Sequence, residues 1–531
     1  MSDLELEPAS FRDPASTVAY LDGRVLRGLT KEGAADFDTL AAAPFFAKAM
    51  DDGKLVRTTQ VPIEDLPQSV RGDAWVKALE HERIPFVTYP YEWTFSMLKD
   101  AALVHLDLLL AALDAELTMK DGYAYNLAFT GARPVFIDVG SFERVRPGEP
   151  WAGYRQFCQT MLYPLLLQAH KDVRFQPWLR GAVQGIQPQD LAKLFTGTDK
   201  MKPGVLKHVS LHGAMDQRYS KSRAQDTQKE LKAAGFSTEL QKATVAAIRK
   251  LVAKLEWGRS ASEWNDYQKT STYTDAEREI KAAFVGKALG GRGAKLVFDL
   301  GGNDGTYSRV AAQHADYVVC ADGDDLVLDG LYRSLRQEGN RQILPAYLDL
   351  SDPSPGLGWR GRERAGFFDR ARPDAVLALA LLHHLAITGN VPLAELVDWL
   401  HSLGGRLVVE FVDPTDPMAD RLLANKPPGM HGDYRREVFE RLEVGVNVAQ
   451  DQILHVAFTS VSNPLEQPLD DLGRQSAHVE ALHLEVQLSG LEPGQSAGRD
   501  PGLCSEVVQG DVAALSQLLQ SWPDRVESAV Q

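Results

Sequence analysis

Apolar and polar positions follow a distinct pattern in the second half of this chain. Beyond Lys295, short continuous apolar runs are separated by segments that have the 3.6-residue period of amphipathic helices. The apolar runs predict five strands, at residues 296–300, 317–321, 343–348, 375–380 and 406–411. Continuous apolar strands separated by helices are typical of a parallel sheet that is covered by helices on both faces. We therefore predict an α/β domain in this half.

The first half mixes strand-like and helical patterns, as expected for an α+β domain. A long apolar stretch covers residues 97–117, and a short apolar run at 134–138 ends in an aspartate. Residues 196–237 are polar and rich in lysine and arginine. Such a composition indicates a solvated linker, with a basic patch for an anionic substrate as the alternative.

Two further helices are predicted between the halves, each from a capping box, in which a side chain at the start and one three positions later cap the helix. The boxes are Thr-x-x-Gln at residues 238–241 and Thr-x-x-Glu at residues 274–277. The second box precedes Ile280 and Phe284, which we expect on the apolar face of its helix.

These changes of pattern divide the chain into four predicted parts. Residues 1–195 form the α+β domain, 196–285 a mostly helical linker or cap, 286–462 the α/β domain, and 463–531 a C-terminal appendage rich in proline, glycine and glutamine. A length of 531 residues agrees with two to four domains.

Composition narrows the class of protein. With 57 Lys and Arg against 72 Asp and Glu, the net charge of −15 disfavours broad binding to nucleic acid or anionic membranes. No apolar run reaches 18 residues, so no membrane span is expected. The acidic start lacks the order of a secretory signal, and the three cysteines have no metal-ligand spacing. We therefore expect a cytoplasmic protein without a metal site.

The most informative stretch follows the first strand of the α/β domain. An apolar strand containing Asp299 runs into Gly301, Gly302, Asn303 and Gly305, and a helical pattern follows. Glycines at such a point let the backbone turn sharply and let a ligand approach closely. In open α/β sheets, ligands bind outside the carboxyl ends of the strands. The stretch therefore predicts a ligand site.

An acidic residue at the end of the next strand supports a nucleoside ligand. Asp322, followed by Gly323, lies 23 positions after Asp299, and a carboxylate there can accept hydrogen bonds from both ribose hydroxyls. The order of glycines in residues 301–305 does not satisfy the G-x-G-x-x-G fingerprint of dinucleotide-binding domains.

The order D-x-G-x-x-x-G at residues 299–305 resembles the first motif of class I S-adenosylmethionine-dependent methyltransferases. Segments 348–350, 374–385 and 407–412 agree with that family in order, so the resemblance covers residues 265–462. It implies a Rossmann-like sheet of seven strands with S-adenosylmethionine as cofactor. The cofactor-binding residues that it implies are Asp299, Gly301, Gly302, Asn303, Gly305, Asp322, Gly323, Asp349, Leu350 and Tyr273, the last as a ring that contacts the sulfonium.

Candidates for catalysis follow the fourth and fifth strands. His383 and His384 lie where cofactor and acceptor should meet, and histidine titrates near neutrality, so either can act as a base. Packing or capping is the alternative role for both. Glu410 is a candidate for orienting an acceptor, with a solvated or capping carboxylate as the alternative. Ordinary packing is likewise the alternative for Tyr273.

The first half resembles protein-kinase-like folds at one loop. Asp121, then Asn126, then Asp138 after an apolar strand match the catalytic aspartate and the two magnesium ligands of that fold. A Gly-rich phosphate loop is missing, and Met119-Lys120 replaces the usual His-Arg or His-Gly. Asn126 and Asp138 are therefore metal ligands only if this domain is an active kinase; an unrelated α+β domain is the alternative.

The combination of residues 89–100, 120–126, 136–138 and 353–359 resembles a group of two-part bacterial methyltransferase proteins, some of them called nodulation proteins. The resemblance implies methyl transfer to an unidentified acceptor, such as a small molecule or a glycan. Three alternatives stay open: a bifunctional kinase–methyltransferase, a non-catalytic nucleoside-binding regulator, and an NAD-dependent oxidoreductase.

Overall fold

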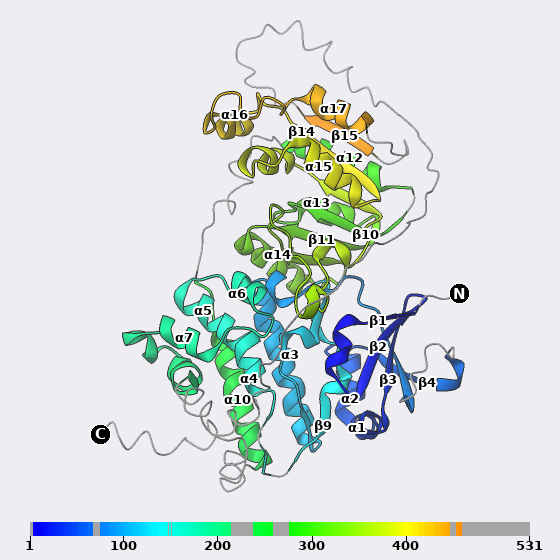
Figure 1. Cartoon of the computed structure of the whole chain (residues 1–531), viewed down its shortest axis with the longest axis vertical. Coiled ribbons are helices and arrows are strands. Elements are labelled where there is room, and N and C mark those ends of the chain that lie inside the picture. The colour runs from blue at the N-terminus through cyan, green and yellow to red at the C-terminus, as the bar shows by residue number, and fades with distance from the viewer. Residues whose placement is uncertain are drawn as a thin grey trace, which may run out of the picture.

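A six-stranded parallel sheet organises the second half of the chain (Figure 1). The computed structural model describes residues 4–66, 75–146, 148–149, 151–213, 237–258, 275–291, 293–445 and 453–458. The strands lie in the order β12-β11-β10-β13-β14-β15. Successive strands are thus added outward on one side from β10 to β12 and on the other side from β13 to β15, so the switch in strand order lies between β10 and β13. Their bounds are β10 Ala294–Leu300, β11 Ala315–Asp322, β12 Ile343–Tyr347, β13 Ala375–Ala378, β14 Arg406–Val412 and β15 Ile453–Phe458.

This sheet confirms the predicted α/β class and all five predicted strands. Seven strands were expected, and the described residues supply six of them. Leu300 pairs with Ala321 in the register of β10 and β11, so both strands leave the sheet at the same edge. Residues 301–305 and Asp322 therefore lie at one carboxyl edge.

Helices connect the strands and cover the sheet. They are α12 Asp275–Leu289, α13 Thr306–Ala311, α14 Asp325–Glu338, α15 Leu393–Ser402, α16 Pro417–Ala424 and α17 Arg436–Gly445. Local chemistry sets the ends of α14: the Asp324 carboxylate accepts the N–H groups of Leu326 and Val327, and Gly339 ends the helix in the left-handed conformation.

The first half is an α+β domain, as predicted. Its antiparallel sheet has the order β1-β2-β3-β5-β4, with strands Leu4–Leu6, Ser16–Leu21, Arg24–Leu29, Lys77–His81 (β5) and Thr58–Val61 (β4). Two small two-stranded antiparallel sheets follow, β6 Leu117–Met119 with β9 Phe142–Arg144 and β7 Leu127–Thr130 with β8 Arg133–Phe136. The helices are α1 Lys31–Ala42, α2 Pro44–Asp51, α3 Phe95–Asp114, α4 Tyr154–Phe157, α5 Tyr163–Lys171, α6 Gln176–Gly181 and α7 Pro188–Leu194.

The two predicted inter-domain helices exist, but they pack on different halves. Helix α10 (Thr238–Lys254) packs along α3, whereas α12 packs against α13 of the sheet domain. The capping box predicted at residues 238–241 is wrong: Ser237 caps α10, and the Gln241 amide instead donates to the Glu149 carbonyl. The first residue of the second predicted box, Thr274, lies outside the described residues.

The two halves share one continuous hydrophobic core, which runs from Leu29 to Phe439. Helix α14 packs against α3 at the contact between them, and Figure 1 shows α14 on the side of the parallel sheet that faces the first half. The three boundaries between the four predicted parts stay a prediction. Among the described helices, none combines the length and apolar character needed to cross a bilayer.

Candidate functional site

The turn after β10 has the sharp backbone that its glycines predicted. Gly301 and Gly305 adopt φ angles of +74° and +77°, and the N–H groups of Gly301 and Gly302 both donate to the Ala321 carbonyl, at 2.8 and 3.1 Å. A Cβ on Gly302 would lie 2.5 Å from the Cys320 sulfur. The turn is therefore held closely against β11, and its glycines are required by the packing of the protein itself.

Asp322 leaves β11 beside this turn. Its carboxylate accepts the backbone N–H groups of Asn303 and Asp324, both at 2.9 Å. Burial raises the pKa of Asp322. The carboxylate thus joins the turn after β10 to the loop after β11, and it is directed toward the turn, as a ribose-binding carboxylate would be.

Asp299 lies beneath the turn. Its side chain is buried and accepts a hydrogen bond of 2.6 Å from the hydroxyl of Ser308 in α13. Burial raises the pKa of Asp299 to about 6. This carboxylate holds the turn against the start of α13.

The loops after β11 and β12 lie on the other side of Asp322. The Asp349 carboxylate accepts the N–H of Ser351 at 2.9 Å and its hydroxyl at 2.6 Å, and Leu350 is half-buried. A Cβ on Gly323 would have the Leu348 carbonyl, at 3.8 Å, as its nearest neighbour. A Cβ at position 323 would therefore make only an ordinary van der Waals contact, and Gly323 itself is exposed beside Asp322.

The first half of the chain also contacts the loop after β12. Arg174 donates to the Tyr347 hydroxyl at 3.2 Å, and Arg180 holds the Asp352 carboxylate with two bonds of 2.8 and 2.9 Å. Tyr347 and Asp352 flank the predicted cofactor contacts at Asp349 and Leu350. Sequence reasoning missed these arginines, since nothing in the local pattern connects them with a site more than 150 residues away.

His383 and His384 follow β13, at the start of a π-helical turn, His384–Thr388. Their ring centroids are 4.0 Å apart, His383 is 2% exposed, and its Nδ1 is buried without a hydrogen-bond partner. Burial lowers the pKa of His384 to about 4 and that of His383 well below its usual value. Both rings are therefore neutral near pH 7, and they offer a weak base.

Glu410 has a partner that sequence reasoning missed. Its side chain, on β14, is 0% exposed and forms an ion pair with Lys281 of α12, which is 4% exposed. The Lys281 ammonium also lies 4.9 Å from the ring centre of Tyr307. The alternative of a solvated Glu410 carboxylate is wrong. The expectation that Ile280 lies on the apolar, buried face of α12 is wrong as well, because Ile280 is 59% exposed.

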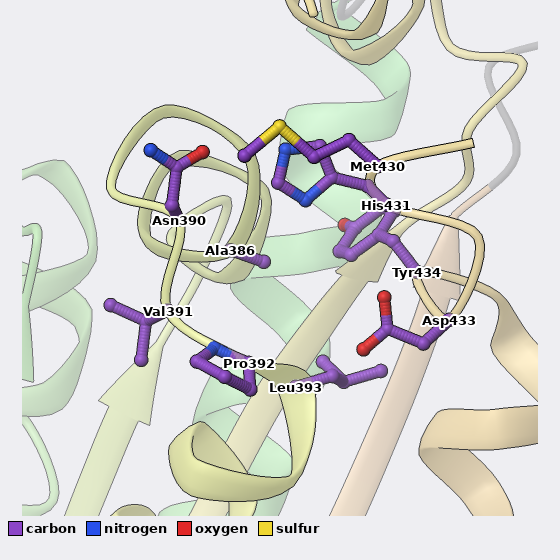
Figure 2. A pocket seen from close by; sticks show the side chains of 9 residues that line it. All are labelled: Ala386, Asn390, Val391, Pro392, Leu393, Met430, His431, Asp433 and Tyr434. Carbon is purple, nitrogen blue, oxygen red and sulfur yellow. The ribbon is translucent and has the colours of Figure 1, made fainter. Parts of the chain in front are cut away.

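A pocket opens beyond the carboxyl ends of β13 and β14, and Figure 2 shows its lining. Its cavity volume is about 130 Å³, and nine residues line it: Ala386, Asn390, Val391, Pro392, Leu393, Met430, His431, Asp433 and Tyr434. The His431 Nε2 atom is buried without a hydrogen-bond partner. The Tyr434 hydroxyl donates to the Val412 carbonyl at 2.8 Å, which fixes this wall to the end of β14.

The three kinase-like positions also come together. The Asn126 carbonyl accepts the N–H of Ile137, next to Asp138, at 2.9 Å. Burial, with a smaller contribution from the Asp138 charge, raises the pKa of Asp121 to about 6. The Asn126 side-chain nitrogen is buried without a hydrogen-bond partner.

A buried arginine forms an ion pair with the Asp138 carboxylate. The Arg27 guanidinium, from β3, lies 2.9 Å from the carboxylate and donates to Ser16 Oγ at 2.9 Å and to His81 Nε2 at 3.2 Å. Burial lowers the pKa of His81 to about 3, so its ring is neutral and can accept this bond. A magnesium ion at Asp138 would have to displace or face this cation.

Tyr273 lies outside the described residues. Within the described residues there is no cluster of three or more His, Cys, Asp and Glu side chains that could hold a metal ion.

Comparison with known proteins gives one relative that spans most of the chain. The chain is 36% identical to nodulation protein NoeA of Rhizobium meliloti (strain 1021) over 437 residues, which is 81% of this chain and 89% of NoeA. No protein-family model matches.

Solved structures similar to parts of the chain include methyltransferases and a kinase. A putative methyltransferase from Pseudomonas syringae is 16% identical over 28% of this chain and 86% of its own, with a TM-score of 0.20. Phosphoethanolamine N-methyltransferase 2 of Haemonchus contortus, in complex with S-adenosyl-L-methionine, is 13% identical over 35% and 44%, with a TM-score of 0.23. Vaccinia related kinase 3 is 13% identical over 48% and 88%, with a TM-score of 0.24.

Proposed function

The chain belongs to the family of nodulation protein NoeA, and from this premise we propose that it is an S-adenosylmethionine-dependent methyltransferase. The observation that carries the proposal is the Asp322 carboxylate. It lies at the carboxyl edge of a parallel sheet, held by the N–H groups of Asn303 and Asp324 beside a glycine turn. This is the arrangement in which an α/β sheet binds the ribose of a nucleoside.

The residues at this edge fit a nucleoside cofactor in two respects. Asp322 is half-buried with its carboxylate directed toward the turn, and Gly323 beside it is exposed. The glycines of the turn add less, because a Cβ on Gly302 or Gly305 would meet the protein's own side chains. S-adenosylmethionine, when bound, supplies an electrophilic methyl group on a sulfonium.

The chain's own residues would bind, orient and shield. Asp322 would hold the ribose hydroxyls, and Asp349 and Leu350 would border the base. Alignment of the reacting atoms is the main contribution that a protein makes to such a displacement. The buried Nδ1 atom of the neutral His383 is suited to orient an acceptor, or to take its proton once that proton has become acidic in the reaction.

We assign the acceptor to the pocket beyond β13 and β14. In Figure 2 the Asp433 carboxylate points into the space between the segment at Asn390–Leu393 and the segment at Met430–Tyr434. Ala386, on the first wall, follows His384 by two residues, which connects the pocket with the histidines at the sheet edge. This small volume favours a small molecule, or one unit of a larger glycan, as the acceptor.

Calorimetric titration tests the proposal. We expect S-adenosylmethionine and S-adenosylhomocysteine to bind the full chain, and Asp322→Asn to weaken both about 10- to 100-fold, because charge-assisted hydrogen bonds are lost. Asp316→Asn is the matched control, since Asp316 is exposed at the opposite end of the same strand, β11. Tight binding of NAD without binding of either sulfur nucleoside would refute the proposal.

The acceptor can be approached with the same pair of variants. Methyl-labelled S-adenosylmethionine, incubated with a cell extract and the full chain, should label a small-molecule or glycan fraction. The labelling should disappear with Asp322→Asn and persist with Asp316→Asn. Cofactor binding without labelling of any fraction would favour the non-catalytic regulator.

We do not propose phosphoryl transfer for the first half. Asp121 has the raised pKa that a general base needs, but the Arg27 guanidinium already neutralises Asp138. A kinase would need that carboxylate for magnesium. We propose instead that residues 1–195 support the sheet domain and its cofactor crevice.

A further inference from the structure

Helix α12 buries a lysine against the sheet and leaves the neighbouring isoleucine exposed. Lys281 is 4% exposed, whereas its neighbour Ile280 is 59% exposed. A rotation of the helix by one position would bury the isoleucine and return the lysine to water, which the hydrophobic effect favours. Departures from the hydrophobic pattern of this kind are expected where function requires them.

The Lys281 ammonium lies where three strands end. It pairs with Glu410 on β14 and lies 4.9 Å from the ring centre of Tyr307, two residues beyond the glycine turn. Its charge also acts on Asp299 of β10, where it lowers a pKa that burial raises. At His383, after β13, it lowers the pKa in the same direction as burial, which has the larger effect. The ammonium is therefore close to the sheet edge at which Asp299 and the glycine turn lie.

Stability does not explain this pair. A buried ion pair loses about as much by desolvation as it gains by attraction, and apolar residues of similar volume often serve as well. Among the described residues of this edge, the fully buried acids include Asp299 and Glu410, and Lys281 is the buried amine. An anionic group bound at this edge would thus be attracted by Lys281 and repelled by its neighbours.

We propose that Lys281 binds the carboxylate of the amino-acid part of S-adenosylmethionine, an inference that rests on the proposed function. An ammonium carries three N–H donors, so it can hold the ligand's carboxylate while Glu410 keeps it in place. Glu410 then acts as a positioning residue for Lys281. The acids nearby suit the positive sulfonium and ammonium groups of the same ligand.

The test compares two ligands that differ only in this carboxylate. S-adenosylmethionine and its decarboxylated analogue both keep the sulfonium, the amine and the nucleoside. Their affinities are measured by calorimetry for the full-length wild type and for Lys281→Met combined with Glu410→Gln. The double variant avoids the unpaired buried charge of a single substitution, and circular dichroism verifies that it folds. Lys287→Met is the control, because Lys287 is exposed on the same helix.

We expect the wild type and Lys287→Met to prefer S-adenosylmethionine about 10- to 100-fold. In the double variant this preference should fall to nearly one, while the analogue keeps its affinity within a few-fold. A preference that survives in the double variant, or its absence from the wild type, would overturn the role of Lys281 and leave the proposed function standing. If neither sulfur nucleoside binds the wild type, the proposed function itself fails.

Discussion

A buried arginine joins the two halves of the molecule. The Arg370 guanidinium, before β13, holds the Glu92 carboxylate with two bonds of 2.6 and 2.7 Å and donates to the carbonyls of Val87 and Ala365. It also lies 4.1 Å from the ring centre of Tyr89. Because Glu92 is 0% exposed and the two partners are 278 positions apart, this contact ties the first half to the sheet domain.

Removal of one partner should be costly. Glu92→Gln leaves a buried guanidinium without its counter-charge, and such a change destabilises a protein by about 3–5 kcal/mol. Arg309 and Glu338 form an ion pair of the same two-bond geometry, at 2.7 and 2.8 Å, but both side chains are exposed. Glu338→Gln should therefore cost less than about 1 kcal/mol.

Urea denaturation, followed by circular dichroism and tryptophan fluorescence, measures both variants. The double substitution Glu92→Leu with Arg370→Met should regain most of the lost stability, because it removes both charges together. If Glu92→Gln and Glu338→Gln shift the unfolding midpoint equally, or if the double variant is the least stable of all, burial does not decide the strength of this ion pair and the reasoning is wrong.

Three further predictions concern single positions. Gly302→Ala should destabilise the protein by about 1–3 kcal/mol, because its Cβ would lie 2.5 Å from the Cys320 sulfur. Gly330→Ala, in open space on α14, should stabilise the protein by about 0.5–1 kcal/mol. Thermal melts that rank the two variants in the opposite order would contradict this reasoning. The pKa of Asp299 is about 6 in the native state against 3.8 in the unfolded chain, so between these values the native state binds more protons. The free energy of unfolding therefore falls as the pH rises from about 4 to 6. Asp299→Asn should remove about 3 kcal/mol of that fall, as measured by denaturation at both pH values. Magnesium with ATP should leave the melting temperature unchanged because Asp138 already has an ion-pair partner; a rise that Asp138→Ala abolishes would restore the kinase alternative.

Local chemistry explains which predictions succeeded. The five predicted strands and the glycine turn follow from residues that are neighbours in sequence, because continuous apolar runs and glycines restrict their own backbone. The wrong capping box at residues 238–241 shows the limit of that reasoning. Ser237 and Thr238 can both cap a helix, and a tertiary contact of Gln241 with Glu149 accompanies the choice of Ser237.

The amino-acid sequence alone determined the parallel sheet, the turn after β10 and the position of Asp322 beside it, since strand order and register bring those residues to one edge. Tertiary structure alone decided that Lys281 rather than Ile280 faces the sheet, and that Arg27 neutralises Asp138. The physical reason is that a charged side chain is buried only where an oppositely charged partner can pair with it. That partner comes from a distant segment of the chain, which the local pattern does not identify.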